Sequence, residues 1–247
     1  EAQRLIDANF LTQQHGMSYL TLGSLYLEFP EHQNGSGFYR DLNLENATTT
    51  TRYQVDDVTY TRTTFASFTD NVIIMHIKAS KANALNFTIA YNFPLVHKVN
   101  VQNDKLTVTC QGKEQEGLKA ALRAECQIQV KTNGTLRPAG NTLQINEGTE
   151  ATLYISAATN YVNYQDVSAD ESRRTSEYLK RAMQIPYEKA LKNHIAYYKK
   201  QFDRVRLTLP AGKASQLETP KRIENFGNGE DMAMAALLFH YGRYLLI

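Results

Sequence analysis

The sequence contains no tryptophan, so its 15 tyrosines and 10 phenylalanines supply all of the aromatic side-chain area. Aromatic rings provide large flat contact surfaces, and modules that bind sugars commonly use tryptophan for this purpose. Its absence argues against a non-catalytic carbohydrate-binding or adhesive β-sandwich. Four tyrosines keep this class of protein open: Tyr19, Tyr39, Tyr161 and Tyr164.

No stretch of the sequence reaches the roughly 18 consecutive apolar residues that a membrane-spanning helix needs. The most apolar segment, MAMAALLF, is short and is followed by His240, Gly242 and Arg243. We therefore predict no membrane span. The first residues, EAQRLIDANF, contain neither an initiator methionine nor a charged segment followed by an apolar one. This start leads us to expect a processed product or a fragment.

Neither the charge of the chain nor its sequence motifs indicate a particular partner or type of site. The chain has 27 basic and 25 acidic residues, spread along its length, and a formal net charge of +2. This balance predicts no nucleic-acid partner and no acidic tail. No P-loop, GxGxxG, HExxH, CxxC or GxSxG motif occurs, and the histidines lack ligand spacing. We therefore predict no catalytic, cofactor-binding or metal site in the chain, and no cofactor. The histidines stand at 15, 32, 76, 97, 194 and 240.

Isolated polar residues are candidates for chemistry, but their spacing does not distinguish them. His76 lies in the apolar segment IIMHIK, and we expect a satisfied core or edge histidine there. We interpret His194 as a packing or solvent residue, and His240 is surrounded by residues typical of a helix core. Five aspartates fall at predicted turns, where Asp forms local hydrogen bonds: Asp56, Asp57, Asp70, Asp104 and Asp166.

The two cysteines, Cys110 and Cys126, lie in strand-like segments on either side of the polar stretch KEQEG. If these segments form a hairpin that turns near Gln115, Cys110 faces a residue near Ala121 and Cys126 faces one near Lys105. The cysteines are then not directly opposed, whereas a disulfide needs Cα atoms within about 7 Å. We therefore expect two free thiols that act as small apolar side chains.

Strand-like segments dominate from residue 19 to residue 162, with roughly ten strands at the spacing typical of a sandwich or barrel. Residues 71–80, NVIIMHIKAS, form a continuous apolar stretch that predicts a strand covered on both faces. No helical pattern separates the strands, so the sheets are expected to be antiparallel. The segments are 22–29, 38–55, 58–68, 71–80, 84–93, 105–110, 118–130, 142–146 and 150–162.

Helical spacing is present at both ends of the chain. Residues 1–14 predict a short helix, and the pattern from Asp170 to Phe202 predicts two more, the second beginning at Pro186 because proline is tolerated in a first turn. Thr219 is a plausible N-cap for a further helical turn, with Pro220 at its first position. After GNGED comes a last helix that is apolar almost all round.

Several segments, taken in order, resemble the N-terminal region of glycoside hydrolase family 95. The last of them continues in that family directly into the catalytic barrel. One departure is Thr63, which stands where the family usually has glutamate. The matching segments are EAQRLID at 1–7, LGSL at 22–25, YRDLNL at 39–44, YTR at 60–62, FASFTD at 65–70, EATLYISAATNYVNY at 150–164, HIAYYKKQFDRVRLTL at 194–209, ETPKRI at 218–223 and LLFHYGRYLLI at 237–247.

The resemblance implies a mainly β fold: an antiparallel super-sandwich followed by a helical linker and the first helix of an α/α barrel. We expect residues 1–169 to form the super-sandwich domain, lacking its first strands, and residues 170–218 to form the linker. Residues 219–247 are then the beginning of the (α/α)6 catalytic barrel. A helix that is apolar all round is one enclosed by protein, so we expect the last helix to be buried by barrel segments beyond Ile247.

The family consists mainly of α-L-fucosidases that act by inversion. The resemblance therefore implies the N-terminal portion of an inverting exo-glycosidase that removes terminal α-L-fucosyl residues. Its acid and base are expected beyond Ile247, so this segment alone is expected to be inactive. Its expected partners are a carbohydrate substrate, bound through the missing barrel, and the remainder of its own chain. An α-L-galactosidase of the same architecture is the alternative enzyme. Because family members act on extracellular glycans, we expect a periplasmic or extracellular location.

Overall fold

The protein forms two antiparallel β-sheets and five α-helices in a computed structural model that describes residues 1–10, 21–114, 117, 119–229 and 231–247. The large sheet has eight strands in the order β2-β3-β4-β5-β12-β9-β8-β7, and the small sheet has four in the order β1-β6-β11-β10. The strands are β1 (Ser24–Glu28), β2 (Ser36–Asn43), β3 (Thr48–Val55), β4 (Val58–Ser67), β5 (Val72–Ala79), β6 (Leu85–Asn92), β7 (His97–Gln102), β8 (Lys105–Gln111), β9 (Arg123–Thr132), β10 (Thr135–Ala139), β11 (Thr142–Gly148) and β12 (Glu150–Thr159).

The predicted mainly β fold with antiparallel sheets followed by helices is confirmed. Two strands were not predicted, β7 and β10, and each lies at the outer edge of its sheet. Edge strands are short and polar because one side of their backbone has no partner strand. Pro138 lies in β10, where an edge position tolerates the missing N–H group.

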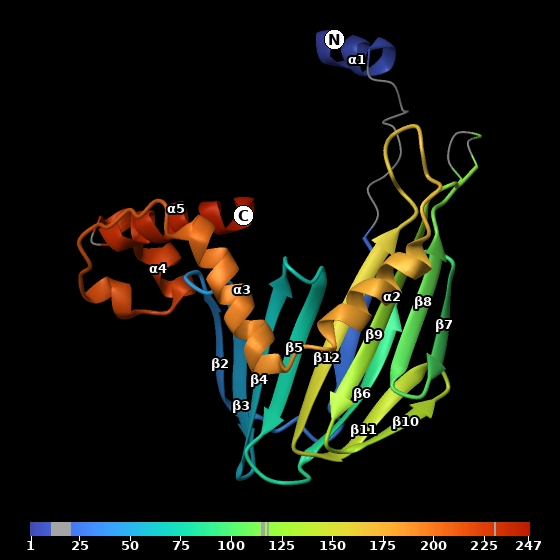
Figure 1. Cartoon of the computed structure of the whole chain (residues 1–247). Helices are drawn as coiled ribbons and strands as arrows, with labels where there is room; N and C mark the ends of the chain where they lie inside the picture. The colour runs from blue at the N-terminus through green and yellow to red at the C-terminus, as the bar shows by residue number, and fades with distance from the viewer. Residues whose placement is uncertain (11–20, 115–116, 118, 230) are drawn as a thin grey trace.

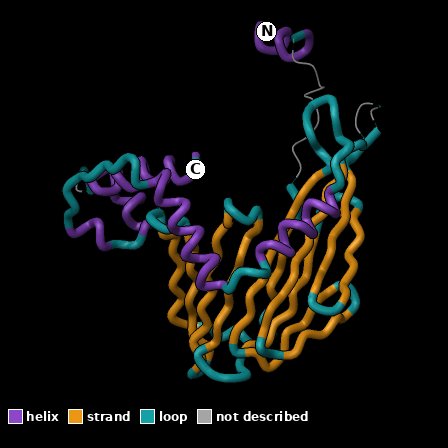
Figure 2. The backbone as a smooth tube through the Cα atoms, in the orientation of Figure 1, coloured by secondary structure: helices purple, strands orange, loops and turns teal. Residues whose placement is uncertain are grey.

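The main core fills the space between the two sheets. Its side chains are fully buried branched apolar residues from both sheets, such as Ile89 and Leu143 in the small sheet and Leu106 and Ile128 in the large one. Leu25, Leu27 and Phe29 pack against this core from the β1 segment, as their alternation predicts. Figure 2 shows the strands as two layers with helices outside the large sheet.

A second core lies on the other face of the large sheet, under helices α2 (Glu171–Ala182) and α3 (Tyr187–Phe202). Strand β5 contributes to both cores: Val72 and Ile74 face the helices, while Ile77 and Ala79 face the small sheet. This arrangement confirms the prediction that residues 71–80 are covered on both faces. The side chains of β5 alternate along the strand, so β5 is part of the wall that the two cores share.

Helix α2 crosses β9 and β12, and α3 lies over the β4 side of the sheet (Figure 1). Asp170 caps α2 by accepting a hydrogen bond from the Arg173 backbone N–H at 2.8 Å. Leu179 and Ala182 form its buried stripe with Thr175. Pro186 immediately precedes α3, as its position in the sequence predicts.

Two α-helices at the end of the chain lie beside α3 rather than on the sheets (Figure 1). They are α4 (Thr219–Asn225) and α5 (Met232–Leu246). The N-cap of α4 is Glu218, one residue before the predicted Thr219, and Glu218 makes no capping hydrogen bond with its side chain. None of the described helices is long and apolar enough to cross a membrane.

The structure describes only the first part of the predicted N-terminal helix. Helix α1 covers Ala2–Asn9, and residues 11–14 of the predicted helix, with His15 and Tyr19, lie outside the described residues. In Figure 1, α1 stands apart from the two sheets.

The prediction of two free cysteines is confirmed, but the predicted pairing register of their two strands is wrong. Both thiols are free. Strands β8 and β9 pair as predicted, but Cys110 lies opposite Ala124 and Cys126 lies opposite Val108. The predicted register depended on a turn near Gln115, which lies outside the described residues. Because the register of a hairpin depends on the length of its loop, a misplaced turn shifts every pair.

Candidate functional site

The candidate site begins at the turn between β2 and β3, which α3 holds with two side chains. The Nε2 atom of His194 lies 3.0 Å from the Asn46 carbonyl oxygen and 3.1 Å from that of Ala47, and it donates to these acceptors. The Tyr198 hydroxyl donates to the Leu44 carbonyl oxygen at 2.8 Å. These bonds link the middle of α3 to the edge of the large sheet.

Burial keeps both side chains uncharged at neutral pH. It lowers the pKa of His194, and the hydrogen bonds to the carbonyl oxygens of Ala47 and Asn46 only partly offset this effect. Burial also raises the pKa of Tyr198 to about 12. His194 stacks on Phe65 with ring centroids 4.7 Å apart. The expectation that His194 is a packing residue is confirmed.

Helix α5 is attached to the end of α3 through Arg243. Its Nη1 atom donates to the carbonyl oxygens of Phe202 and Val205, both at 2.7 Å, and its Nη2 atom donates to that of Gln201 at 3.2 Å. The guanidinium also lies over the Phe202 ring, 4.9 Å from its centroid. The last carbonyl groups of a helix have no partners within it, and a cation beside them is favourable. Arg243 thus caps the C-terminus of α3.

His240 joins α5 to the extended segment that follows α3. Its Nε2 atom lies 3.0 Å from the Leu207 carbonyl oxygen and 3.3 Å from the Leu207 nitrogen, so either tautomer engages the same backbone residue. The Nδ1 atom is enclosed and has no hydrogen-bond partner in the part of the chain that the structure describes. This bonding gives His240 a packing role.

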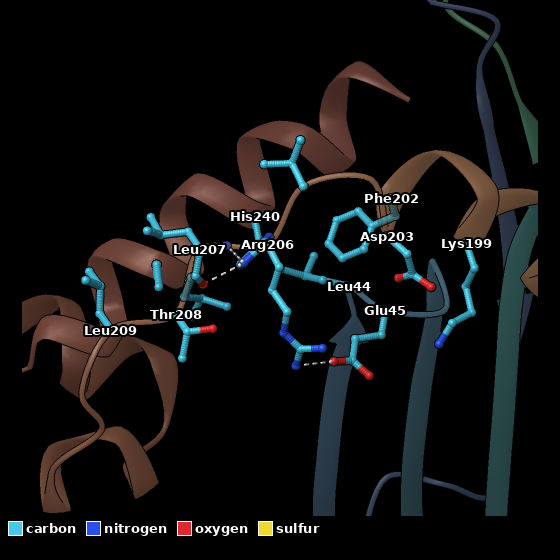
Figure 3. Close-up of a pocket in the computed structure, with 13 residues that line it drawn as sticks. Leu44, Glu45, Lys199, Phe202, Asp203, Arg206, Leu207, Thr208, Leu209 and His240 are labelled. Atoms are coloured by element: carbon cyan, nitrogen blue, oxygen red, sulfur yellow. Dashed lines mark hydrogen bonds and ion pairs between the residues drawn. The ribbon is translucent and has the colours of Figure 1, made fainter.

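A hollow of about 410 Å³ lies among these elements (Figure 3); we call it the junction hollow. Its walls are the β2–β3 turn, the end of α3, the segment after α3, and α5. Leu44, Phe202 and Leu207 give it an apolar lining. Four charged residues also line it: Glu45, Lys199, Asp203 and Arg206.

The two carboxylates of the junction hollow lie in ordinary surface environments. Glu45 is exposed and pairs with Arg206, its Oε1 atom 3.6 Å from Nη2. Asp203 is the C-cap residue of α3, and its backbone N–H donates to the Lys199 carbonyl oxygen at 2.9 Å. Neither carboxylate has a hydrogen-bonded base or nucleophile beside it among the described residues. The pair of Glu45 and Arg206 joins two walls of the hollow, the β2–β3 turn and the segment after α3.

A buried ion pair fixes the start of α5. Arg222 of α4 donates from Nε to Oδ2 of Asp231 at 2.7 Å and from Nη2 to Oδ1 at 3.1 Å. Asp231 also caps α5 by accepting from the Met234 backbone N–H at 3.1 Å. The Arg222 guanidinium holds the pKa of Asp231 below its usual range. The sequence analysis did not assign Asp231; its position just before the helix is the signal that identifies such a cap.

The other sequence candidates lie apart from this junction. His76 stacks on Tyr187 with centroids 4.1 Å apart and bonds through Nδ1 to the Thr152 hydroxyl at 2.9 Å, so it is the satisfied histidine that was predicted. Tyr39 lies on β2, whereas Tyr161 and Tyr164 follow β12, four strands away, so the described tyrosines form no common platform. The five aspartates lie at turns, as predicted: Asp56, Asp57, Asp70, Asp104 and Asp166.

The fold defines a class: a two-sheet antiparallel β domain followed by the helices α2 to α5. Residues 1–164 match the family described as "Glycosyl hydrolase family 65, N-terminal domain", and the chain belongs to this family. Residues 186–247 match the family described as "Glycosyl hydrolase family 95 catalytic domain". The resemblance to family 95 is confirmed.

Two curated relatives align with most or all of the chain. Alpha-L-fucosidase 2 of Arabidopsis thaliana is 26% identical, over 100% of this chain and 33% of its own length. Probable alpha-fucosidase A of Aspergillus niger is 24% identical, over 93% of this chain and 30% of its own length. The chain thus spans about a third of the length of these relatives.

Among solved structures, a putative kojibiose phosphorylase from the human microbiome is similar over 68% of this chain and 25% of that chain. Its sequence identity is 10% and its TM-score is 0.48.

Proposed function

We propose that this chain is the N-terminal portion of an inverting exo-glycosidase that hydrolyses terminal α-L-fucosyl residues of glycans. One observation carries the proposal: the whole chain aligns with a protein named Alpha-L-fucosidase 2, and its last residues match a family 95 catalytic domain. The general acid and base lie in the part of the enzyme that follows Ile247. The isolated chain is then inactive.

In this proposal the chain positions the first helix of the catalytic barrel. Arg243 ties α5 to the end of α3, and the His194 and Tyr198 bonds tie α3 to the sheet. Inversion needs two carboxyl groups about 6.5–9.5 Å apart with a water between them. A separation set to that tolerance needs a rigid frame, and these contacts supply its first element.

The exposed apolar face of α5 supports the same role. Leu238 is 66% exposed and Leu245 is 63% exposed, and Met232 and Phe239 are also exposed. A helix with apolar residues on all sides is normally enclosed by protein. The proposed occupants of this face are the barrel helices that follow in the same polypeptide. Gly242 has open space at its Cβ position, so no described segment approaches the backbone of α5 closely at this residue.

The test compares two proteins on an aryl α-L-fucoside: this chain alone and the polypeptide that continues beyond Ile247. We expect turnover only by the longer protein, with nuclear magnetic resonance showing β-L-fucose as the first product. Comparable turnover by the chain alone overturns the proposal, and initial release of α-L-fucose overturns the inverting mechanism. The same assay with an aryl α-L-galactoside tests the alternative α-L-galactosidase, which differs in pocket detail beyond this chain.

A non-catalytic carbohydrate-binding β-sandwich is the candidate from another class. Glycan binding combined with no hydrolysis by the longer protein favours it. We also propose a periplasmic or extracellular location, because terminal fucosyl residues are carried by glycans outside the cell. Fractionation of cells that express the longer protein tests this location, and recovery in the cytoplasm overturns it.

A further inference from the structure

A second hollow lies at the end of the sandwich opposite to α4 and α5. It has a volume of about 560 Å³ and shares no lining residue with the junction hollow. Its walls are the segment after β1, the β3–β4 turn, and the adjoining ends of β6 and β11. In Figure 1 these strand ends lie at the bottom of the molecule. We call it the sandwich-end hollow.

The lining of the sandwich-end hollow combines aliphatic and polar side chains, and it contains one uncharged histidine. Pro30, Val55 and Val58 contribute aliphatic surface. The His32 ring lies against Tyr60 with centroids 4.3 Å apart, and its Nδ1 atom is 2.7 Å from the Tyr53 hydroxyl. Burial lowers the pKa of His32, so the imidazole is neutral at neutral pH. These contacts hold the ring in one position.

Carboxylates and amides complete the lining. Glu31 and Asp56 supply carboxylates, and Asn86 and Asn146 supply amides. Asn86 accepts the Glu147 backbone N–H at 2.8 Å through Oδ1, so its Nδ2 group remains a donor. The pKa of Tyr60 is raised first by burial and then by the negative charges of Glu31 and Asp56, which places both carboxylates near one phenol. Within the described part of the chain, no lysine or arginine lines this hollow.

We propose that the sandwich-end hollow binds one or two neutral pyranose units of a glycan without cleaving them. Binding pockets of about 300–1,000 Å³ with an apolar lining and a few placed polar groups are typical of small-molecule sites. A pyranose ring has a C–H face that suits the aliphatic part of this mixed lining. It also has hydroxyl pairs that donate strongly to carboxylates, which suits the polar part. The negative rim disfavours anionic ligands.

This inference rests on the proposed function in one respect: it gives a glycan-cleaving enzyme a second contact with its substrate. The sandwich-end hollow and the proposed catalytic site then lie at opposite ends of the β domain, because the proposed catalytic barrel begins with α5. A site that holds a distant sugar of a large glycan raises affinity for polymeric substrates by multivalency. It adds nothing for a small aryl glycoside.

The experiment is saturation-transfer nuclear magnetic resonance on this chain with methyl β-D-galactoside, methyl β-D-glucoside and methyl α-L-fucoside. We expect saturable binding of at least one, weakened by about tenfold or more in the Glu31→Gln/Asp56→Asn double variant. Asparagine tolerates the positive φ of 50° at position 56, so this change keeps the turn. The matched control is Asp57→Asn, because Asp57 lies in the same turn but pairs with Lys81.

Circular dichroism and melting temperature of each variant show whether it is folded. No saturable binding of any probe by the folded chain overturns the proposal. Binding of glucosamine or calcium ions alone also overturns it, since this marks a cation site. Equal loss in the Asp57→Asn control overturns it as well, because the effect then comes from the turn as a whole.

The failure of this inference is distinguishable from failure of the proposed function. In the longer protein, Glu31→Gln/Asp56→Asn is expected to leave turnover of an aryl α-L-fucoside unchanged while slowing cleavage of a large fucosylated glycan. If the longer protein lacks fucosidase activity but the chain binds sugars, only the proposed function fails. Unchanged cleavage of the large glycan, with sugar binding intact, overturns the anchoring role.

Discussion

Arg222 and Asp231 form a two-pronged ion pair between α4 and the start of α5, with side chains that are 10% and 4% exposed. Asp231 is also the N-cap of α5. This one residue therefore links α4 to α5 and satisfies a backbone N–H group in the first turn of α5. Removal of one partner from a buried pair leaves the other charge without compensation. Arg222 lies on the short helix α4, but its ion pair makes it important for the orientation of α5.

The first prediction concerns Arg222→Met. We expect the start of α5 to open more often, and limited proteolysis between Phe226 and Met232 to become severalfold faster, because cleavage follows the population of the open form. Lys221→Met is the neighbouring control, since Lys221 is exposed. Equal proteolysis of the two variants contradicts the role assigned to the ion pair.

The same pair predicts a response to acid. The folded pKa of Asp231 is depressed by Arg222, so the pair stabilises the fold above the unfolded pKa of 3.8. This contribution is lost as the pH falls through the folded value. The protection factor of the Met234 amide, which Asp231 caps, is expected to fall on acidification in the wild-type protein, after correction for the slower intrinsic exchange in acid. It is expected to depend less on pH in Arg222→Met.

The second prediction concerns Arg243→Met. Loss of the hydrogen bonds to the end of α3 is expected to cost about 2 kcal/mol of the free energy of unfolding. Amide exchange is expected to increase at residues 201–205. Arg206→Met is the control, because its exposed pair with Glu45 is worth less than about 1 kcal/mol. Denaturant unfolding measures both, and a larger loss in the control overturns the capping role.

The third prediction concerns pH and His194. The folded pKa of His194 lies below the unfolded value of 6.5, because of burial. Between these two values the unfolded chain binds more protons, so stability rises with pH across this window and is lost on acidification. His194→Gln keeps a donor for the two carbonyl groups and cannot titrate. It is expected to lose less stability between about pH 8 and pH 5.

His76 also has a pKa lowered by burial, so His194→Gln retains part of the pH dependence. Addition of His76→Gln is expected to flatten the curve further. The measurement is urea unfolding over that pH range. If the free energy of unfolding of His194→Gln depends on pH as steeply as that of the wild type, His194 is not a source of the pH dependence.

The fourth prediction concerns deletion of residues 230–247. The exposed apolar side chains of α5 exceed what one neighbouring helix covers. We expect the deletion to raise solubility while leaving the β-sheet circular dichroism signal intact, although the end of α3 loses its Arg243 cap. If the intact chain is a stable monomer that unfolds on this deletion, α5 is part of the β domain itself. The barrel-helix interpretation is then wrong.

Local patterns predicted most of the fold. The apolar stretch 71–80 became a strand covered on both faces, and Asp170 and Pro186 stand where α2 and α3 begin. Strands β7 and β10 were not predicted, because both are short edge strands that bury little surface. In β7, Val99 and Val101 do alternate with polar residues, and this pattern could have identified the strand. The domain boundaries at 169 and 218 stay predictions.

The site was harder to predict, because its contacts join distant segments. From the sequence, Arg243 was only a polar residue after an apolar segment, and its partners are carbonyl oxygens at the end of α3 and just after it. No local pattern in the sequence indicates which backbone atoms a lone arginine reaches. The sandwich-end hollow has the same origin: Glu31, Asp56 and Asn146 meet only when both sheets have formed.

The hydrogen bonds of His194 and Tyr198 to the β2–β3 turn also have a consequence for biosynthesis. They join residues 148 and 154 positions apart. A ribosome delivers about 5–20 residues per second, so β2 and β3 emerge several seconds before His194 and Tyr198. During that interval the β2–β3 turn has only its local hydrogen bonds to Asn43. The attachment of this turn to the rest of the molecule is therefore completed only after α3 has left the exit tunnel.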